Sequence, residues 1–248
     1  METTVSAENK IIQIVPDRNS LIDAALTTWK ETAAEAIEEK GYFTVALSGG
    51  STPIPLYQKC ATLKKELPWK DTYIFQVDER YVGIDHDDNN YKSIYENMVK
   101  PLGIIPAHVV RVPVENNTAE NAARGYEDAI KEFFCARNIQ FPRFDLMFLA
   151  IGGDGHTASL FPGLTSLSER KRWVVSVKND TVNHERITLT FPVLNQAKHI
   201  VFLMSGKDKA YQVVKVLKNT ACDLPAALIR LQDGIVTYLV DKEAAWYM

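Results

Sequence analysis

Residues 144–162 read FDLMFLAIGGDGHTASLFP, and this stretch decides the fold. Its first part, Phe144 to Ile151, is almost unbroken apolar sequence, as is typical of a strand buried on both faces in the middle of a parallel sheet. Glycines follow at once, as expected where such a strand ends in a tight turn. The stretch predicts an α/β fold around a central strand, with the chemistry in the loop at that strand's carboxyl end.

Other short runs rich in β-branched and aromatic residues occur along the chain, and helical patterns separate them. This alternation predicts a parallel sheet covered by helices. The other predicted strands are Ile11–Val15, Tyr42–Leu47, Tyr73–Val77, Val109–Val114, Trp173–Val177, Ile200–Met204 and Ile235–Val240. The chain has no internal repeat and no linker rich in Pro, Gly or Ser. We therefore expect residues 1–248 to form a single Rossmann-like domain, with a mostly parallel sheet and helices on both faces.

Three helices are predicted. The first lies between the first two strands, where Ser20 with Asp23 resembles a capping box and Gly41 closes the segment. The others run from about Thr118 to Arg137 and from about Lys207 to Lys218. The apolar positions that give the first helix its spacing are Ile22, Leu26, Trp29, Ala33 and Ile37.

The composition is that of an ordinary globular protein. Hydrophobic residues make up 46% of the 248 and charged residues 24%, which excludes intrinsic disorder. The net charge is −3 with no run of like charges, so no nucleic-acid partner is expected. Any anionic ligand must be bound by a few groups gathered at one site, and not by an overall positive charge. The opening METTVSAENK lacks the basic patch and apolar core of a signal peptide, and no apolar run is long enough to span a membrane. We expect a cytosolic location and no membrane partner.

The cysteines and the terminal aromatic residues are interpreted structurally. Cys60, Cys135 and Cys222 are odd in number and far apart, without zinc-type spacing, so we expect reduced, buried thiols. Trp246 and Tyr247 are expected to pack on the domain rather than to form a contact surface.

The loop after the predicted strand Tyr42–Leu47 reads SGGSTP, residues 48–53. Gly49 and Gly50 let the backbone approach an anion, Ser51 and Thr52 add donors, and Pro53 suits the first turn of a helix. This pattern predicts a phosphate cradle. A tight strand-to-helix turn with a serine cap fits equally well, and the GxxxxGK[ST] pattern of nucleoside triphosphate loops is absent.

The loop after Tyr73–Val77 begins with Asp78, Glu79 and Arg80. The acids and the arginine could anchor one another or a polar substrate, and Arg80 could hold a phosphate or polarise a carbonyl. Acids at a strand end often only cap the next helix. The stretch Asp85 to Asp88 lacks the EF-hand spacing, so we expect a solvated loop, with neither calcium nor another metal.

The third loop, after the central strand, carries His156 in a glycine-rich turn. A histidine presented there suits proton transfer near neutral pH, and Asp154 could orient the imidazole as the acid of a triad does. A purely structural histidine is the less favoured alternative. Gly153, Gly155 and Ala158 also fit a GxGxxA dinucleotide pattern. That match is weak, because the next predicted strand offers no acid at its end.

Two basic residues follow later in the chain. Arg186 opens the alternating run ERITLT, residues 185–190, and Lys209 lies in GKDKA, residues 206–210, after the strand Ile200–Met204. Such residues are most often solvated. A lysine just after a strand's end, however, is placed to meet a phosphate held by the other loops.

Taken in order, these motifs resemble the 6-phosphogluconolactonase family from about Ile11 to Val240. They are SGGSTP, DER at residues 78–80, GGDGHTASLFP at 152–162, ERITLT, and GxxKA at 206–210. The resemblance implies a fold of the sugar-phosphate isomerase type. One position departs from the family pattern, because Asn89 stands where the family usually has serine, although asparagine also caps helices.

The resemblance implies hydrolysis of 6-phosphoglucono-δ-lactone to 6-phosphogluconate in the oxidative pentose phosphate pathway, with no metal, no organic cofactor and no obligate protein partner. It implies that His156 is the general base, that Asp154 orients it, and that Arg80 binds the lactone or stabilises charge on its carbonyl. Asp78 would also contact substrate, and Lys207 would be secondary. The implied ligands of the 6-phosphate are Gly49, Gly50, Ser51, Thr52, Arg186 and Lys209.

Three rival functions stay open at this point. Glucosamine-6-phosphate deaminases are similar in fold but need an acid five residues after the histidine, where this chain has Phe161. NAD kinases and diacylglycerol kinases share GGDG but continue to threonine where His156 stands. A non-catalytic sugar-phosphate sensor would keep the cradle without turnover, and the intact His156 and Asp154 argue against it.

Overall fold

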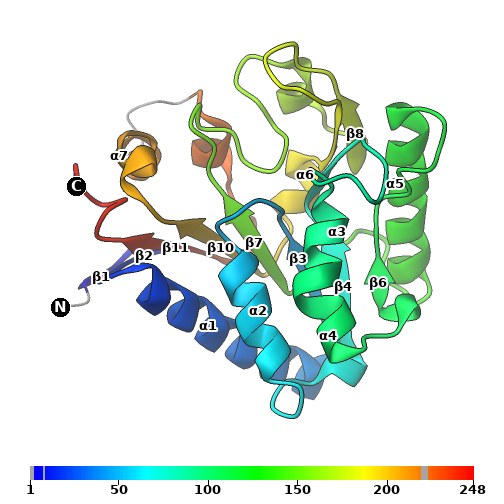
Figure 1. Cartoon of the computed structure of the whole chain (residues 1–248), viewed down its shortest axis with the longest axis horizontal. Coiled ribbons are helices and arrows are strands. Elements are labelled where there is room, and N and C mark those ends of the chain that lie inside the picture. The colour runs from blue at the N-terminus through cyan, green and yellow to red at the C-terminus, as the bar shows by residue number, and fades with distance from the viewer. Residues whose placement is uncertain (1–2, 8, 219–222) are drawn as a thin grey trace.

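A computed structural model describes residues 3–7, 9–218 and 223–248 (Figure 1). Its large sheet has the strand order β1-β2-β11-β10-β7-β3-β4-β6, and a small sheet has the order β5-β9-β8. The large sheet comprises β1 (Thr3–Ala7), β2 (Lys10–Val15), β3 (Phe43–Leu47), β4 (Thr72–Gln76), β6 (Val109–Val110), β7 (Leu146–Ala150), β10 (His199–Met204) and β11 (Ile235–Asp241). Among its described strands, all neighbours pair in parallel except β1 and β2.

Helices cover both faces of this sheet (Figure 1). Helices α1 (Arg18–Lys40) and α2 (Ile54–Thr62) pack on one face, and α5 (Ala119–Cys135) and α7 (Ala210–Leu217) on the other. The shorter helices are α3 (Asn90–Ile94), α4 (Lys100–Leu102) and α6 (Phe191–Leu194), with a π-helical turn at Tyr95–Val99. Short 3₁₀ turns occupy Trp69–Asp71, Pro106–His108, Thr165–Ser168, Lys207–Lys209 and Pro225–Leu228.

The central position predicted for Phe144–Ile151 is confirmed. Strand β7 pairs with β10 on one side and β3 on the other, and its side chains alternate between the two apolar cores. Leu146 and Phe148 face α1 and α2, whereas Met147 and Leu149 face α5. The predicted fold class, a mostly parallel sheet with helices on both faces, is confirmed.

Two predicted strands differ from the observed ones. Trp173–Val177 does form a strand, β8 (Val174–Val177), but it belongs to the small antiparallel sheet with β9 (Arg186–Leu189) and β5 (Asp78–Arg80). Only its end residues are buried, which suits a strand at the edge of a small sheet. The run Val109–Val114 shortens to β6, because Pro113 has no N–H for a ladder and the Val112 N–H donates to the Gln76 side chain instead.

The predicted helices are present, with one cap in a different place. The capping box expected at Ser20 and Asp23 is wrong: α1 begins earlier, and the Asp17 carboxylate caps it by accepting from the Ser20 N–H at 2.8 Å. Gly41 ends α1 in the left-handed conformation, at φ 80°, as expected. Thr118 caps α5, and the predicted segment Lys207–Lys218 forms a 3₁₀ turn followed by α7.

The structure tests the expectations about the cysteines, about Trp246 and Tyr247, and about membrane-spanning segments. Cys60 is buried, but Cys135 is exposed because it lies on the solvent side of the last turn of α5, and Cys222 falls outside the described residues. Trp246 and Tyr247 do not pack into the domain: they are 62% and 56% exposed, in a surface turn after β11. Within the described ranges, the chain contains no helix with the length and apolarity needed to cross a bilayer.

His199 makes folding stability sensitive to acid. It opens β10 at the amino edge of the sheet, where Nε2 lies 2.8 Å from the Thr237 hydroxyl and burial lowers the pKa of the imidazole to about 4. The unfolded chain binds a proton near its ordinary pKa, so this contribution to stability is present above about pH 6.5 and is lost as pH falls toward 4. We expect a loss of about 1–2 kcal/mol between pH 7 and pH 5. Urea unfolding at pH 7 and pH 5 measures this loss. An equal loss in His199→Gln would show that His199 does not cause it.

Candidate active site

A cavity of about 780 Å³ opens at the carboxyl edge of the large sheet. Loops that follow β2, β3, β7, β10 and β11 line it, because parallel strands deliver their carboxyl ends to one edge. Its size lies within the usual range for small-molecule sites, roughly 300–1,000 Å³. All three segments singled out from the sequence, residues 48–53, 78–80 and 152–162, contribute to this cavity. The predicted site residues that line it are Gly49, Gly50, Ser51, Thr52, Asp78, Arg80, His156 and Lys209.

His156 and Asp154 form a pair in the turn after β7. His156 Nδ1 lies 2.5 Å from Asp154 Oδ1, and the His156 backbone N–H donates to the same oxygen at 3.1 Å. The turn is closed by the Gly152 N–H, which donates to the His156 carbonyl at 2.8 Å. On its other side the imidazole packs against the Phe161 ring, with centroids 4.7 Å apart. The ring is therefore held in place yet is still 32% exposed to the cavity.

The charge on Asp154 sets the tautomer of His156. Burial raises the pKa of Asp154, but the His156 N–H and imidazole outweigh that effect, and the pKa lies below its ordinary value. The carboxylate is therefore ionised at neutral pH and accepts a hydrogen bond from the Nδ1–H group. This assignment leaves the lone pair of Nε2 free to take a proton from a ligand.

Two glycines are required by close approaches to site side chains. A Cβ on Gly152 would lie 2.1 Å from two atoms of the His156 ring, and a Cβ on Gly49 would lie 1.7 Å from Asn90 Oδ1. Such distances are far below van der Waals contact, so any other residue must displace the neighbour. The glycines thus serve the placement of His156 and Asn90 as well as backbone access.

We expect Gly152→Ala to lower kcat by about 10- to 100-fold, because a shift of about 1 Å in a catalytic group can cost that much. Gly153→Ala is the matched control, since a Cβ there meets nothing within 4 Å. Steady-state kinetics on both variants tests the claim. Equal losses would show that backbone rigidity, not the clash with His156, is responsible.

Two buried hydrogen bonds to core residues anchor the SGGSTP loop. The Ser48 hydroxyl donates to the Phe148 carbonyl at 2.8 Å, and the Tyr57 hydroxyl donates to the Ser48 carbonyl at 2.6 Å, both in the core. Gly50 adopts φ 87°, which favours glycine. Ser48 thus fixes the strand-to-helix turn, but the expected serine cap is absent, because the N-cap residue of α2 is Pro53 and makes no side-chain cap hydrogen bond. The next four residues line the cavity.

The DER segment is a strand, β5, and not the loop expected from the sequence. It pairs antiparallel with β9, which places Arg80 opposite Arg186. Glu79 is fully buried and accepts from the N–H groups of Arg80, Asn90 and Tyr91 at 2.7–2.8 Å, and from the Gln76 amide at 2.6 Å. Burial nevertheless raises its pKa to about 7. Glu79 therefore caps α3 and fixes the strand, as strand-end acids often do.

Asp78, in β5, and Asn90, the first residue of α3, both line the cavity and lie side by side. The Ser159 hydroxyl donates to Asp78 Oδ2 at 2.6 Å, and the Asn90 amide donates to the Asp78 carbonyl at 3.0 Å. Asn89, the position that departs from the family pattern, caps α3 by accepting from the Lys92 N–H at 2.8 Å. Asparagine thus fills the capping role there.

The predicted cations are only partly brought together. Arg80 and Lys209 line the main cavity, whereas Arg186 lines an adjoining hollow of about 310 Å³ that it shares with Arg80. Burial and then the neighbouring Arg80 charge lower the pKa of Arg186. Lys207 lies apart, with its ammonium 4.1 Å from the centre of the Trp246 ring.

Sequence reasoning missed Arg18 and Asp241. Arg18 lines the cavity and donates to the Ser51 carbonyl at 2.6 Å. Asp241 accepts from the Ser205 hydroxyl at 2.5 Å and from the Gly206 N–H at 3.2 Å, which fixes the loop that carries Lys209. Both stand at the carboxyl end of a strand, β2 and β11, so the rule that located the other three loops also points to them.

The fold and the cavity define an α/β protein with a histidine–aspartate pair and several cations at the carboxyl edge of a parallel sheet. Residues 16–238 match the family described as glucosamine-6-phosphate isomerases/6-phosphogluconolactonase. A 6-phosphogluconolactonase from Nostoc sp. is 37% identical over 238 residues, which cover 95% of this chain and 97% of the relative. The chain therefore belongs to the 6-phosphogluconolactonase family.

Other members of the family are similar to this protein over most of its chain. The crystal structure of 6-phosphogluconolactonase from Thermotoga maritima superposes with a TM-score of 0.81 at 30% identity, covering 94% of this chain and all of the other. A relative from Arabidopsis thaliana named 6-phosphogluconolactonase 3, chloroplastic, is 37% identical and covers 96% of this chain and 75% of its own length.

Proposed function

We propose that this chain hydrolyses 6-phosphoglucono-δ-lactone to 6-phosphogluconate, a step of the oxidative pentose phosphate pathway, with His156 as the general base. The observation that carries the proposal is the His156–Asp154 pair, which opens on a cavity that also holds Arg80, Arg18 and Lys209. The names of the relatives support the choice of substrate.

In the proposed reaction, His156 Nε2 removes a proton from water as the water oxygen attacks the lactone carbonyl carbon. The tetrahedral oxyanion that forms is stabilised by Arg80 and by backbone N–H groups of the glycine-rich turn. As the intermediate collapses, the bond to the ring oxygen breaks, and the imidazolium returns its proton to that oxygen as it becomes a hydroxyl. The product carboxylic acid loses its own proton to solvent. Asp154 stays ionised and stabilises the transient imidazolium.

We assign the 6-phosphate to the part of the cavity lined by the SGGSTP loop and Lys209. The backbone of Gly49 and Gly50, the hydroxyls of Ser51 and Thr52, and the ammonium of Lys209 supply donors there. Arg18 belongs to this set because it is hydrogen-bonded to the loop itself. Arg186 would act from the adjoining hollow through its charge beside Arg80, and Asp78 would accept a sugar hydroxyl.

Rival functions fit these residues less well. In deaminases the place of Phe161 is held by an acid, and here an apolar ring, 2% exposed, packs against His156. A nucleotide kinase would need the threonine that His156 replaces. A sensor would not need the ionised Asp154 beside the imidazole.

The direct test is lactone hydrolysis by purified protein. The lactone is generated in situ with glucose-6-phosphate dehydrogenase, and its disappearance is followed against the spontaneous background. We expect clear acceleration. If there is none, ammonia release from glucosamine 6-phosphate separates the deaminase from the sensor alternative.

We expect Lys209→Ala to raise KM about 10-fold with little change in kcat, because a phosphate contact made equally in the ground and transition states acts on binding. Arg18→Ala should behave in the same way. The matched control is Lys207→Ala, whose ammonium lies over Trp246 and outside the cavity lining, and which should leave KM unchanged. A loss confined to kcat would remove Lys209 from the phosphate site.

A further inference from the structure

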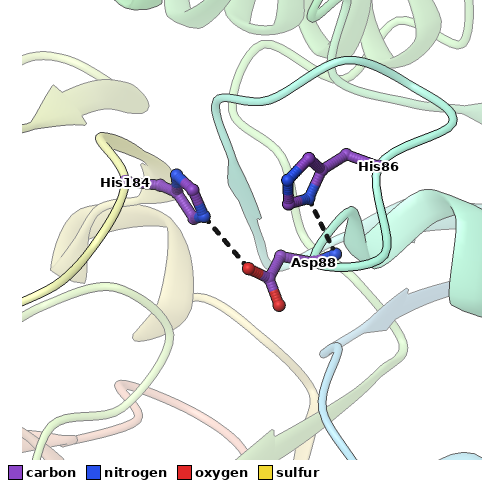
Figure 2. Close-up of side chains that lie close together, drawn as sticks. All are labelled: His86, Asp88 and His184. Atoms are coloured by element: carbon purple, nitrogen blue, oxygen red, sulfur yellow. Dashed lines mark hydrogen bonds and ion pairs between the residues drawn. The ribbon is translucent and has the colours of Figure 1, made fainter.

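A cluster of potential metal ligands lies beside the active site: His86, Asp88 and His184 (Figure 2). One ligand atom of each residue lies within 4.8 Å of the other two. His86 and Asp88 come from the segment between β5 and α3, and His184, 96 residues beyond Asp88, from the segment between β8 and β9. Residues 85–88 alone predict a solvated loop, but the fold adds a second imidazole that local sequence cannot reveal.

We propose that these three side chains bind a divalent transition-metal ion of the zinc class. Two imidazoles and one carboxylate form a donor set that suits zinc and its neighbours and that neither calcium nor magnesium prefers. Bonds of about 2.0–2.1 Å in a tetrahedral site put ligand atoms about 3.3 Å apart. His184 Nε2 and Asp88 Oδ2 are already 3.0 Å apart. His86 is exposed, so its side chain can move to close the remaining distance.

A bound metal would displace the hydrogen bonds that the cluster now makes. A cation between His184 and Asp88 replaces the contact that these two side chains now make with each other. His86 Nδ1 accepts the Asp88 N–H at 3.0 Å, and a metal on Nδ1 would release that N–H to solvent, since Asp88 is exposed. Each ligand has to be deprotonated, so affinity falls as the solution is acidified.

The surrounding charges nearly balance. Asp85 and Asp87 lie on the same segment, and Asp87 pairs with Lys92 at 2.8 Å. The two nearby arginines point at backbone carbonyls of the cluster: Arg80 donates to the Asp88 carbonyl and Arg186 to the His184 carbonyl, both at 2.9 Å.

The same backbone contacts connect the metal cluster to the cavity. The two residues that hold the arginines through their carbonyls would hold the metal through their side chains. A bound ion would therefore tie the segments before α3 and β9 together and fix Arg80 at the edge of the cavity.

Titration calorimetry with Zn²⁺ tests the proposal. The parent protein carries His156→Asn, which removes the imidazole of the main cavity as a competing ligand. We expect this parent to bind one Zn²⁺, and His86→Asn or His184→Asn in the same background to weaken binding by at least about 10-fold. His108→Asn is the matched control, because His108 packs on Tyr73 away from the cluster. Zn²⁺ should raise the Tm of the parent and of the His108 variant more than that of the His184 variant.

Three results would overturn the site: no Zn²⁺ binding to the parent, an affinity in the His86 and His184 variants equal to that of the parent, or a loss in His108→Asn as large as theirs. Circular dichroism of each variant without metal confirms that it is folded. Substitution of Co²⁺ adds a second readout, since ligand-field absorption bands report nitrogen ligation and should change in both cluster variants. Unchanged bands would also reject the assignment.

Discussion

The His156→Ala variant is expected to lose roughly 10²–10⁴ in kcat, the usual contribution of a general base. Water at neutral pH is a poor nucleophile toward an ester carbonyl, and the variant has no group at the position of Nε2 to take its proton. Phosphosugar affinity should stay within a few-fold, because the cations and the SGGSTP loop are untouched. KM and kcat should therefore separate, with nearly all of the loss in kcat.

Stopped or continuous assays of lactone disappearance, corrected for spontaneous opening, measure this effect. Asp154→Asn is the informative companion variant, because it keeps the shape of the pair but favours the wrong tautomer of His156. His108→Ala, a substitution far from the cavity lining, is the control for a histidine loss in general. A His156 variant with wild-type kcat would place the base elsewhere in the cavity.

The central part of this arrangement could be predicted from sequence because its signals are local. An apolar run such as Phe144–Ile151 is stable as a strand only where it is buried on both faces, in the middle of a parallel sheet. Its parallel neighbours then bring their carboxyl ends, and the loops that follow them, to the same edge of the sheet. Gly49 and Gly152 stand where any Cβ would collide with Asn90 or His156. The sequence marks these positions as glycine without revealing which side chain needs the space.

The parts that sequence missed depend on pairing between distant segments. DER looks like a loop until its antiparallel partner, Arg186–Leu189, is known, and that pairing also places Arg186 outside the main cavity. The residues of the strand Val174–Val177 do not indicate which of the two sheets it joins. His184 gains its partners only through the same small sheet. Register between strands far apart in sequence is decided by packing, which periodicity does not encode.

A second large effect is expected at the other edge of the sheet, where Asp145 holds the start of β7. Its side chain is fully buried and accepts from the Thr44 N–H at 2.9 Å, the Thr44 hydroxyl at 2.8 Å and the Lys40 ammonium at 2.8 Å. Lys40 ends α1 and Thr44 lies in β3, so one carboxylate joins three elements. Burial lowers the pKa of Lys40, and the Asp145 charge acts against that shift.

We expect Asp145→Ala to lower the free energy of unfolding by about 3–5 kcal/mol, because the substitution leaves a mostly buried ammonium and a buried N–H without their acceptor. Urea denaturation measures the loss. Asp233→Ala is the control, since that carboxylate is 90% exposed in its ion pair with Arg143 and should contribute at most about 1 kcal/mol.

Adding Lys40→Met to Asp145→Ala should recover part of the stability, because the unpaired Lys40 charge is then removed as well. The folded variants should keep wild-type kcat, since Asp145 does not line the cavity. A loss below about 1 kcal/mol in Asp145→Ala would mean that water replaces the carboxylate there, and that the strand ladders and apolar packing of β7 hold its start without the Asp145 side chain.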